Sequence, residues 1–261
     1  SPNLRAPELM TNTETPLDGK VAVVTGSARN IGRATAKRLA DYGVSVVVNA
    51  VQDSEAADAV AHEIFEAGGR ALAHICDITD EDAVNEMAET AVKAFGSVDI
   101  LVSNASIRAQ KPFLEIDTEE WHRTLAVPLD GAFFCARACA PHMIKNKWGR
   151  IITIGGISAY IGTANRVGLL AAKSGLVGLT RGLAVELADH GITCNVVSPG
   201  HINTVRPGTA GARPPMKVEP PIKRFGHVEE IAGMVHYLCL PEAAYITGQT
   251  MHINGGLYYG V

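Results

Sequence analysis

A glycine-containing turn near the start of the chain has the residue types and spacing of a phosphate-binding loop. A β-branched run, Val21 to Thr25, leads directly into Gly26-Ser-Ala-Arg-Asn-Ile-Gly32, and a helical pattern follows. Gly26 allows a tight turn off the strand, and Gly32 allows the helix to pack closely. The free N–H groups of the first helical turn would then face a pyrophosphate. The spacing predicts a dinucleotide site, and an ordinary glycine-rich strand-to-helix turn is the alternative.

This loop has to be positioned by a sheet, and the rest of the chain predicts one. Seven apolar runs are expected to be strands: Lys20–Thr25, Val44–Asn49, Ala71–Cys76, Ile100–Ser103, Arg150–Ile154, Ile192–Ser198 and Thr250–Ile253. Their near-continuous Val/Ile/Leu composition is typical of parallel strands that are covered on both faces. Six segments with helical periodicity lie between them: Ile31–Tyr42, Ser54–Ala67, Asp80–Phe95, Thr118–Asn146, Ala164–His190 and Val228–Leu240. Alternation with right-handed crossovers predicts one α/β domain with a doubly wound parallel sheet, a Rossmann fold with helices on both faces.

Two segments fall outside this alternation. Residues 1–16 are polar, contain proline and lack the apolar core of a secretory signal, so we expect a mobile tail before a domain of residues 17–261. Residues 203–223 contain five prolines and no apolar period. They follow the carboxyl end of a predicted strand, where ligands bind in open α/β sheets, so we interpret them as a lid over the substrate.

The composition excludes several classes of function. The formal net charge is −4 and the basic residues are scattered, which argues against nucleic acid and against a membrane surface as partner. No apolar run approaches the roughly 20 residues that span a bilayer. The five cysteines are odd in number, widely spaced and without a CxxC pair, so we expect buried free thiols in a cytoplasmic protein and no metal site.

The loop of Thr25 to Gly32 resembles the Thr-Gly-x-x-x-Gly-x-Gly loop of the short-chain dehydrogenase/reductase family, with Asn30 in place of the middle glycine. Asparagine tolerates a left-handed backbone better than most residues, so the substitution is compatible with the loop. Other segments resemble the family in the same order, between about Leu17 and Leu257. They are Cys76-Asp-Ile78, Ser103-Asn-Ala-Ser106, Ser198-Pro-Gly-His-Ile-Asn-Thr204, Arg224–Ala232, Tyr245–Thr250 and Asn254-Gly-Gly256.

The resemblance implies a nicotinamide dinucleotide and the residues that hold it, on a pattern like that of 3-oxoacyl-acyl-carrier-protein reductases. The implied cofactor-binding residues are Thr25, Gly26, Ser27, Arg29, Asn30, Ile31, Gly32, Asp77, Ile78, Asn104, Ala105, Lys173, Pro199, Gly200, Ile202 and Thr204. Relatives that prefer NAD usually carry an acid at the end of the second strand, where this chain has Ala50 or a close neighbour. Arg29 is available for a 2′-phosphate, or is a solvated loop charge, and we expect NADP(H) to be favoured over NAD(H).

The resemblance also implies a proton-transfer site that this chain lacks in part. The family pattern is Tyr-x-x-x-Lys with a serine 13 residues before the tyrosine. Here the segment reads Leu169-Leu-Ala-Ala-Lys173, so the lysine is kept and leucine replaces tyrosine. Gly156 stands at the serine position, and Pro128 replaces the family asparagine of the preceding helix, where proline would keep a kink. We expect weak or absent ordinary carbonyl reduction.

Two other side chains are speculative proton carriers, Tyr160 and His201, although packing and loop roles are the more common fates of such residues. Three functions remain open: an oxidoreductase with a non-standard site acting on a small hydroxy or oxo compound, a lyase or isomerase on the same fold, and a silent dinucleotide-binding module. Relatives pair through their long helices, and Gly175, Gly178 and Gly182 would permit close approach here. A homo-oligomer, tetramer or dimer, is therefore expected.

Overall fold

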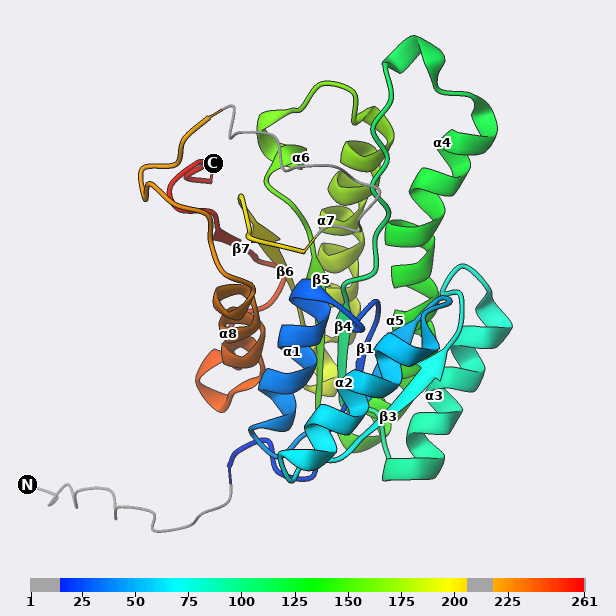
Figure 1. Cartoon of the computed structure of the whole chain (residues 1–261). Coiled ribbons are helices and arrows are strands. Elements are labelled where there is room, and N and C mark those ends of the chain that lie inside the picture. Colours follow the sequence, from blue (N-terminus) through cyan, green and yellow to red (C-terminus); the bar gives the residue numbers. More distant parts are fainter. Residues whose placement is uncertain (1–14, 206–217, 261) are drawn as a thin grey trace, which may run out of the picture.

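A seven-stranded parallel sheet forms the centre of the molecule. The computed structural model describes residues 15–205 and 218–260, so most of the predicted tail and the middle of the predicted lid lie outside the described residues. The strand order is β3-β2-β1-β4-β5-β6-β7, which is doubly wound about β1 and β4 (Figure 1). The strands are β1 (Val21–Val24), β2 (Ser45–Ala50), β3 (Ala71–Ile75), β4 (Ile100–Ser103), β5 (Gly149–Ile154), β6 (Ile192–Pro199) and β7 (Thr250–Ile253). The predicted fold class and all seven strands are confirmed.

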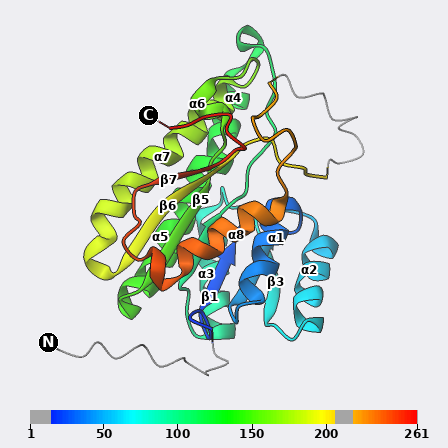
Figure 2. The same ribbon diagram turned by 90° about the vertical axis from the view of Figure 1, so that its left-hand side faces the viewer.

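Helices cover both faces of the sheet, as the buried runs of its strands require. The helices on one face are α1 (Asn30–Ala40), α2 (Ser54–Glu66) and α8 (Val228–Cys239), and those on the other are α3 (Glu81–Phe95), α5 (Gly131–Asn146) and α7 (Val167–Leu187) (Figure 2). Two apolar cores result, one on each side of the strands. All five cysteines lie buried as free thiols, as predicted. In the described ranges no helix is both long and apolar enough to span a bilayer.

The predicted helix Thr118–Asn146 is interrupted. It consists of α4 (Thr118–Leu125), a π-helical turn at Ala126–Asp130 and α5. Pro128 lies buried in the middle of the π turn. Because proline has no N–H and its ring displaces the preceding carbonyl, a continuous α-helix could not pass through it unchanged. The single long helix was therefore wrong, whereas the expected interruption at Pro128 is present.

The predicted helix Ala164–His190 begins later than expected. The α-helix α7 starts at Val167, and a short helix, α6 (Ser158–Ile161), precedes it. Asn165 lies between them in a left-handed conformation, with φ of 64°. A left-handed residue ends or precedes a helix rather than continuing one, which explains the boundary. The segment α6 carries Tyr160 and joins the end of β5 to the start of α7.

Candidate functional site

The phosphate loop has the backbone that its sequence predicts. Gly26 and Asn30 are both left-handed, with φ of 60° and 51°. A Cβ on Gly26 would lie 3.0 Å from the Cα of Ala105, and one on Gly32 would lie 2.5 Å from the carbonyl oxygen of Gly26. The two glycines therefore allow close backbone approach, and asparagine at position 30 keeps the left-handed turn that the family's glycine would make.

Side chains that directly follow β1 and β4 support the loop. The Thr25 hydroxyl oxygen accepts hydrogen bonds from the N–H groups of Asn104 and Ala105, both at 3.0 Å. The side-chain amide of Asn104 donates to the carbonyl oxygens of Thr25 and Gly26, at 2.9 and 3.0 Å. Thr25 is fully buried, so its hydroxyl has no water to replace these bonds, whereas Asn104 and Ala105 are half-buried. The predicted residues Thr25, Asn104 and Ala105 are thus brought together beneath the loop.

A buried asparagine, Asn49, supports the loop from β2 and was missed at the level of sequence. Its side-chain oxygen accepts the N–H of Gly26 at 3.1 Å, and its amide donates to the carbonyl oxygen of Cys76 at 3.2 Å. Its backbone N–H donates to the Ser27 hydroxyl at 3.0 Å, which in turn donates to the Val24 carbonyl oxygen at 2.6 Å. A polar residue at the end of an apolar strand was the signal that could have revealed it. Ser27 is fully buried in this network.

The first turn of α1 has donors to offer an anion. Its N-cap, Arg29, makes no side-chain capping hydrogen bond. The neighbouring helices differ, because the carboxylates of Asp53, Asp80 and Asp117 cap α2, α3 and α4. The N-terminal N–H groups of a helix and its dipole both favour negative charge. A pyrophosphate fits this position, between the carboxyl ends of β1 and β4 where the sheet order reverses.

The side chain of Arg29 is engaged by an acid on the next helix. Its guanidinium forms an ion pair with the carboxylate of Asp53. The other oxygen of Asp53 accepts the N–H of Ala56 at 3.0 Å as the cap of α2. Ala50 ends β2 and is buried, so no acid occupies the end of that strand. Asp77 follows β3 and is exposed, and its carboxylate accepts a hydrogen bond from the N–H of Thr79 at 2.9 Å.

Lys173 is the buried cation of the candidate active site. It lies on α7, and its ammonium donates to the carbonyl oxygen of Ile154, at the end of β5, at 2.6 Å. Burial lowers the pKa of this side chain from its usual range to about 8. Leu169 lies one turn earlier on the same helix and is half-buried. A Cβ on Gly156 would meet only the Ser158 hydroxyl, at 3.9 Å, so the space beside it is open.

The two speculative proton carriers lie in different surroundings. The Tyr160 hydroxyl donates to Thr250 on β7 at 3.3 Å, and its ring packs against the rings of His252 and Tyr258. His201 lies after β6, with its ring edge-on to Phe225. Burial and the nearby Arg166 lower the pKa of His201, so the imidazole is neutral at pH 7.

The turn after β6 is held against the C-terminal segment. Gly200 donates its N–H to the carbonyl oxygen of Ile253 at 2.9 Å, and a Cβ on Gly200 would lie 2.6 Å from the Cα of Asn254. Further on, Ile202 forms a parallel bridge with Gly226. The Thr204 hydroxyl accepts a hydrogen bond from Arg108 at 3.4 Å. The two ends of the predicted lid are therefore joined at its base.

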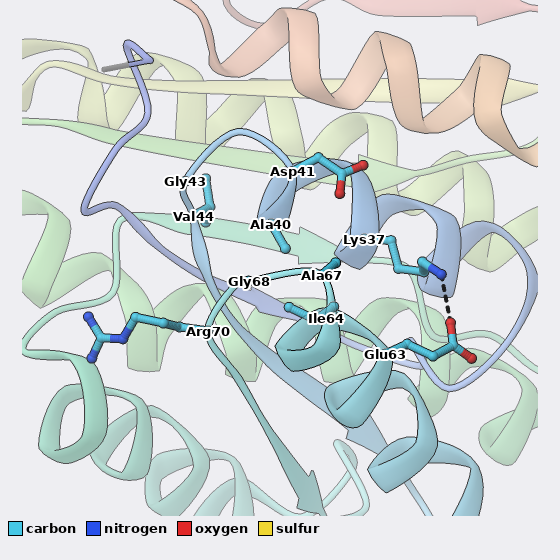
Figure 3. A pocket seen from close by; sticks show the side chains of 11 residues that line it. Lys37, Ala40, Asp41, Gly43, Val44, Glu63, Ile64, Ala67, Gly68 and Arg70 are labelled. Atoms are coloured by element: carbon cyan, nitrogen blue, oxygen red, sulfur yellow. Dashed lines mark hydrogen bonds and ion pairs between the residues drawn. The ribbon is translucent and has the colours of Figure 1, made fainter. Parts of the chain in front are cut away.

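A hollow of about 400 Å³ lies at the opposite edge of the sheet, at the carboxyl ends of α1 and α2 (Figure 3). Its charged lining includes Asp41, Arg70 and the ion pair of Lys37 with Glu63, whose atoms lie 2.7 Å apart. Helix carboxyl ends disfavour anions, and the ion pair leaves little net charge for a ligand. The hollow lies at the other end of α1 from the phosphate loop, and its charges do not indicate a site for an anion. Among the described residues, no group of three His, Cys, Asp or Glu side chains is placed to hold a metal.

Comparison with known proteins finds a family model and relatives that match most of the chain. The family model described as enoyl-(acyl carrier protein) reductase matches residues 26–258. The chain is 41% identical to a 3-oxoacyl-[acyl-carrier-protein] reductase of Synechocystis, over 93% of this chain and 98% of that protein. It is 38% identical to the reductase of the same name from Aquifex aeolicus, over 94% and 100%.

Solved structures are similar over the same range. A dehydrogenase/reductase from Sinorhizobium meliloti has a TM-score of 0.84 at 36% identity and covers 92% of this chain and 95% of its own. A mutant short-chain dehydrogenase/reductase from Serratia marcescens has a TM-score of 0.83 at 38% identity, over 92% and 98%.

The lowered pKa of Lys173 predicts a pH-dependent stability. The unfolded chain holds a proton on this residue up to its ordinary pKa of 10.5, whereas the folded chain releases it near 8. Between these values the unfolded state binds more protons, so the free energy of unfolding rises with pH. From pH 8 to 10 we expect the native chain to gain about 2 kcal/mol relative to Lys173→Met, measured by urea unfolding. Below pH 7 this residue adds no slope.

Lys145→Met is the matched control, because Lys145 is exposed at the end of α5. That variant should retain the pH dependence of the native chain. Parallel curves for the native chain and Lys173→Met would contradict the buried ammonium.

Proposed function

The chain belongs to the short-chain dehydrogenase/reductase family, and from this premise we propose that it binds a nicotinamide dinucleotide and acts, slowly, on a small oxo or hydroxy compound through a non-standard active site. Membership of this family supports an oxidoreductase activity. The observation that carries the dinucleotide site is the pair of left-handed residues, Gly26 and Asn30, which opens onto the uncapped first turn of α1.

The residues around this loop would hold the dinucleotide in sequence along the carboxyl edge of the sheet. The N–H groups of Ile31 and Gly32 are suited to the pyrophosphate, and Asp77 and Ile78 to the adenine side. Asn104 and Ala105 form the floor, and Lys173 would bond the ribose next to the nicotinamide. Pro199, Gly200, Ile202 and Thr204 would close over the carboxamide. The bound nicotinamide would donate or accept the hydride of the reaction.

We propose NADP(H) as the preferred cofactor. Ala50 leaves no acid at the end of β2 to repel a 2′-phosphate or to bind ribose hydroxyls. Arg29 lies in the loop and offers a guanidinium, the side chain best suited to a phosphate. Asp53 holds that guanidinium, so a 2′-phosphate would compete with a carboxylate for it. The preference for NADP(H) should therefore be moderate.

The proposed defect lies in proton transfer. Leu169 has no proton to give, and Gly156 has no hydroxyl to orient a carbonyl oxygen. General acid–base catalysis contributes about 10²–10⁴-fold, and such groups act as a unit, so we expect turnover at least about 10³-fold below that of an intact relative. Among the groups described above, the ammonium of Lys173 is best suited to take the proton role, because burial brings its pKa to about 8. The hydroxyl of Tyr160 donates a hydrogen bond to the hydroxyl of Thr250 on β7.

The same two replacements support a second candidate, a module that binds the dinucleotide without turning over a substrate. A lyase or isomerase that causes no net redox change is a third reading of the same site. Among substrates, the two relatives above suggest 3-oxoacyl thioesters as the class to test first. Isotope exchange at C4 of the nicotinamide separates the oxidoreductase from both alternatives.

Restoring the missing groups should restore activity. The double variant Leu169→Tyr with Gly156→Ser adds a phenol four residues before Lys173 and a hydroxyl into open space. We expect carbonyl reduction, measured as NADPH oxidation with a simple ketone or oxoester, to rise by about 10²-fold or more. The control, Leu169→Phe with Gly156→Ser, supplies the ring without its hydroxyl and should show no comparable gain. Turnover of about 1 s⁻¹ or more by the native chain would contradict the proposed defect.

Removing the guanidinium of Arg29 should weaken the binding of NADPH but not that of NADH. A charge-assisted hydrogen bond contributes about 1.5–3 kcal/mol, so Arg29→Ala should raise the Kd for NADPH by about tenfold or more and leave that for NADH nearly unchanged. Calorimetric titration measures both. Arg33→Ala, which removes a guanidinium paired with Glu63, is the control and should leave both values unchanged. Asp53→Asn should tighten the binding of NADPH, because asparagine can still cap α2 but has no carboxylate to compete with the phosphate for Arg29.

We propose that the chain forms a homo-oligomer through α5 and α7. Phe133 on α5 and Val185 on α7 are exposed, and a Cβ on Gly178 or Gly182 would meet open space. Light scattering should give the mass of a dimer or a tetramer. Gly178→Arg, placed on this face, should lower the mass to that of a monomer while the circular dichroism spectrum is retained. A monomeric native chain would contradict the proposal.

A further inference from the structure

The side chain of Asn30 joins the two sides of the proposed dinucleotide site. Its amide donates to the carbonyl oxygen of Val205 at 3.1 Å, and its side-chain oxygen accepts the N–H of Val205 at 2.7 Å. The two residues are 175 positions apart in sequence. The pair has the form of a backbone ladder in which a side-chain amide takes the place of one strand. We call this pair of hydrogen bonds the Asn30–Val205 clasp.

The clasp depends on the residue type at position 30. Asn30 begins α1 with φ of 51°, a conformation that glycine and asparagine accept at low cost. Glycine there would make the same loop but could not reach across to residue 205. Asparagine carries both a donor and an acceptor in one plane, which a two-bond contact with a single peptide requires.

The clasp lies between the two ends of the site. On one side is the uncapped first turn of α1, proposed above for the pyrophosphate. On the other is the segment that follows the Pro199–Gly200 turn, proposed for the nicotinamide carboxamide. A dinucleotide bound across the carboxyl edge of the sheet runs from one side to the other. Gly26 packs closely against Ala105 at the base of this site, since a Cβ on Gly26 would lie 3.0 Å from the Cα of Ala105.

We propose that Asn30 is a positioning residue that closes the dinucleotide site through Val205, so that the cofactor enters and leaves only when both hydrogen bonds open. The inference rests on the proposed dinucleotide site. Because the cofactor would pass the clasp in either direction, the need to open it slows association and dissociation alike. A cofactor held in this way exchanges slowly and is retained over many encounters with substrate.

The test is the kinetics of cofactor exchange. NADPH and NADH fluorescence in a stopped-flow instrument gives kon, and displacement by excess unlabelled oxidised cofactor gives koff. Asn30→Gly keeps the left-handed turn and removes both hydrogen bonds of the clasp, so both rates should rise by about tenfold or more. The Kd should stay within about threefold.

Two variants at the other end of the clasp separate it from a local effect on the loop. Val205→Pro removes the N–H donor without altering α1, and should raise both rates in the same direction. In the double variant with Asn30→Gly the effects should not add, because both changes break one contact. Val205→Ala keeps the backbone groups and is the control, with rates like those of the native chain.

The outcomes decide between the proposals. Unchanged rates in Asn30→Gly would overturn the clasp while leaving the dinucleotide site intact. A higher koff with an unchanged or lower kon, and a correspondingly weaker Kd, would overturn it too, because residue 30 would then act only by shaping the phosphate loop. If calorimetry detects no binding of NADPH or NADH to the native chain, both this inference and the proposed function fail.

Discussion

Where the strands of the sheet end, their last backbone groups lose the partners that the ladder supplied, and buried or half-buried side chains take over. Thr25, Asn49 and Asn104 do this for β1, β2 and β4. Their side chains accept hydrogen bonds from backbone N–H groups or donate them to backbone carbonyl oxygens, both in the loop at Gly26 and at the ends of neighbouring strands. A buried polar group without a partner costs about 1–3 kcal/mol, so each of these residues fixes the loop as well as satisfying itself. The shape of the phosphate loop follows from this network.

The lysine of the candidate active site, Lys173, costs stability, whereas the side chains around the loop contribute to it. Its ammonium is buried and donates a hydrogen bond to the backbone carbonyl oxygen of Ile154, and burial lowers its pKa to about 8. A buried charge of this kind destabilises the fold at neutral pH. Leu169 and Gly156 offer no hydrogen bond that would offset this cost. Lys173 therefore costs stability at neutral pH, and the proposed contact with a bound cofactor would offset that cost.

The sequence predicted the sheet, its strands and the left-handed residue Asn30 in the loop after β1, because these depend on local composition and on spacing. It predicted less well where two distant segments meet. The role of Asn49, the ion pair of Arg29 with Asp53 and the contact of Asn30 with Val205 each require a partner far along the chain. The π turn at Pro128 shows a further limit, since proline indicated an interruption but its form depended on the packing around it.

The two halves of the proposed site differ in how strongly they are tied to the fold. The groups around the phosphate loop also satisfy buried backbone atoms, so a change at Thr25, Asn49 or Asn104 would cost stability as well as cofactor binding. Gly156 borders open space, and Leu169 sits half-buried on the surface of α7. Serine and tyrosine at those positions would serve the reaction without supporting the sheet, so their loss removes chemistry at little cost to folding. Under the proposed function, a scaffold built in this way would give up proton transfer and still hold a dinucleotide.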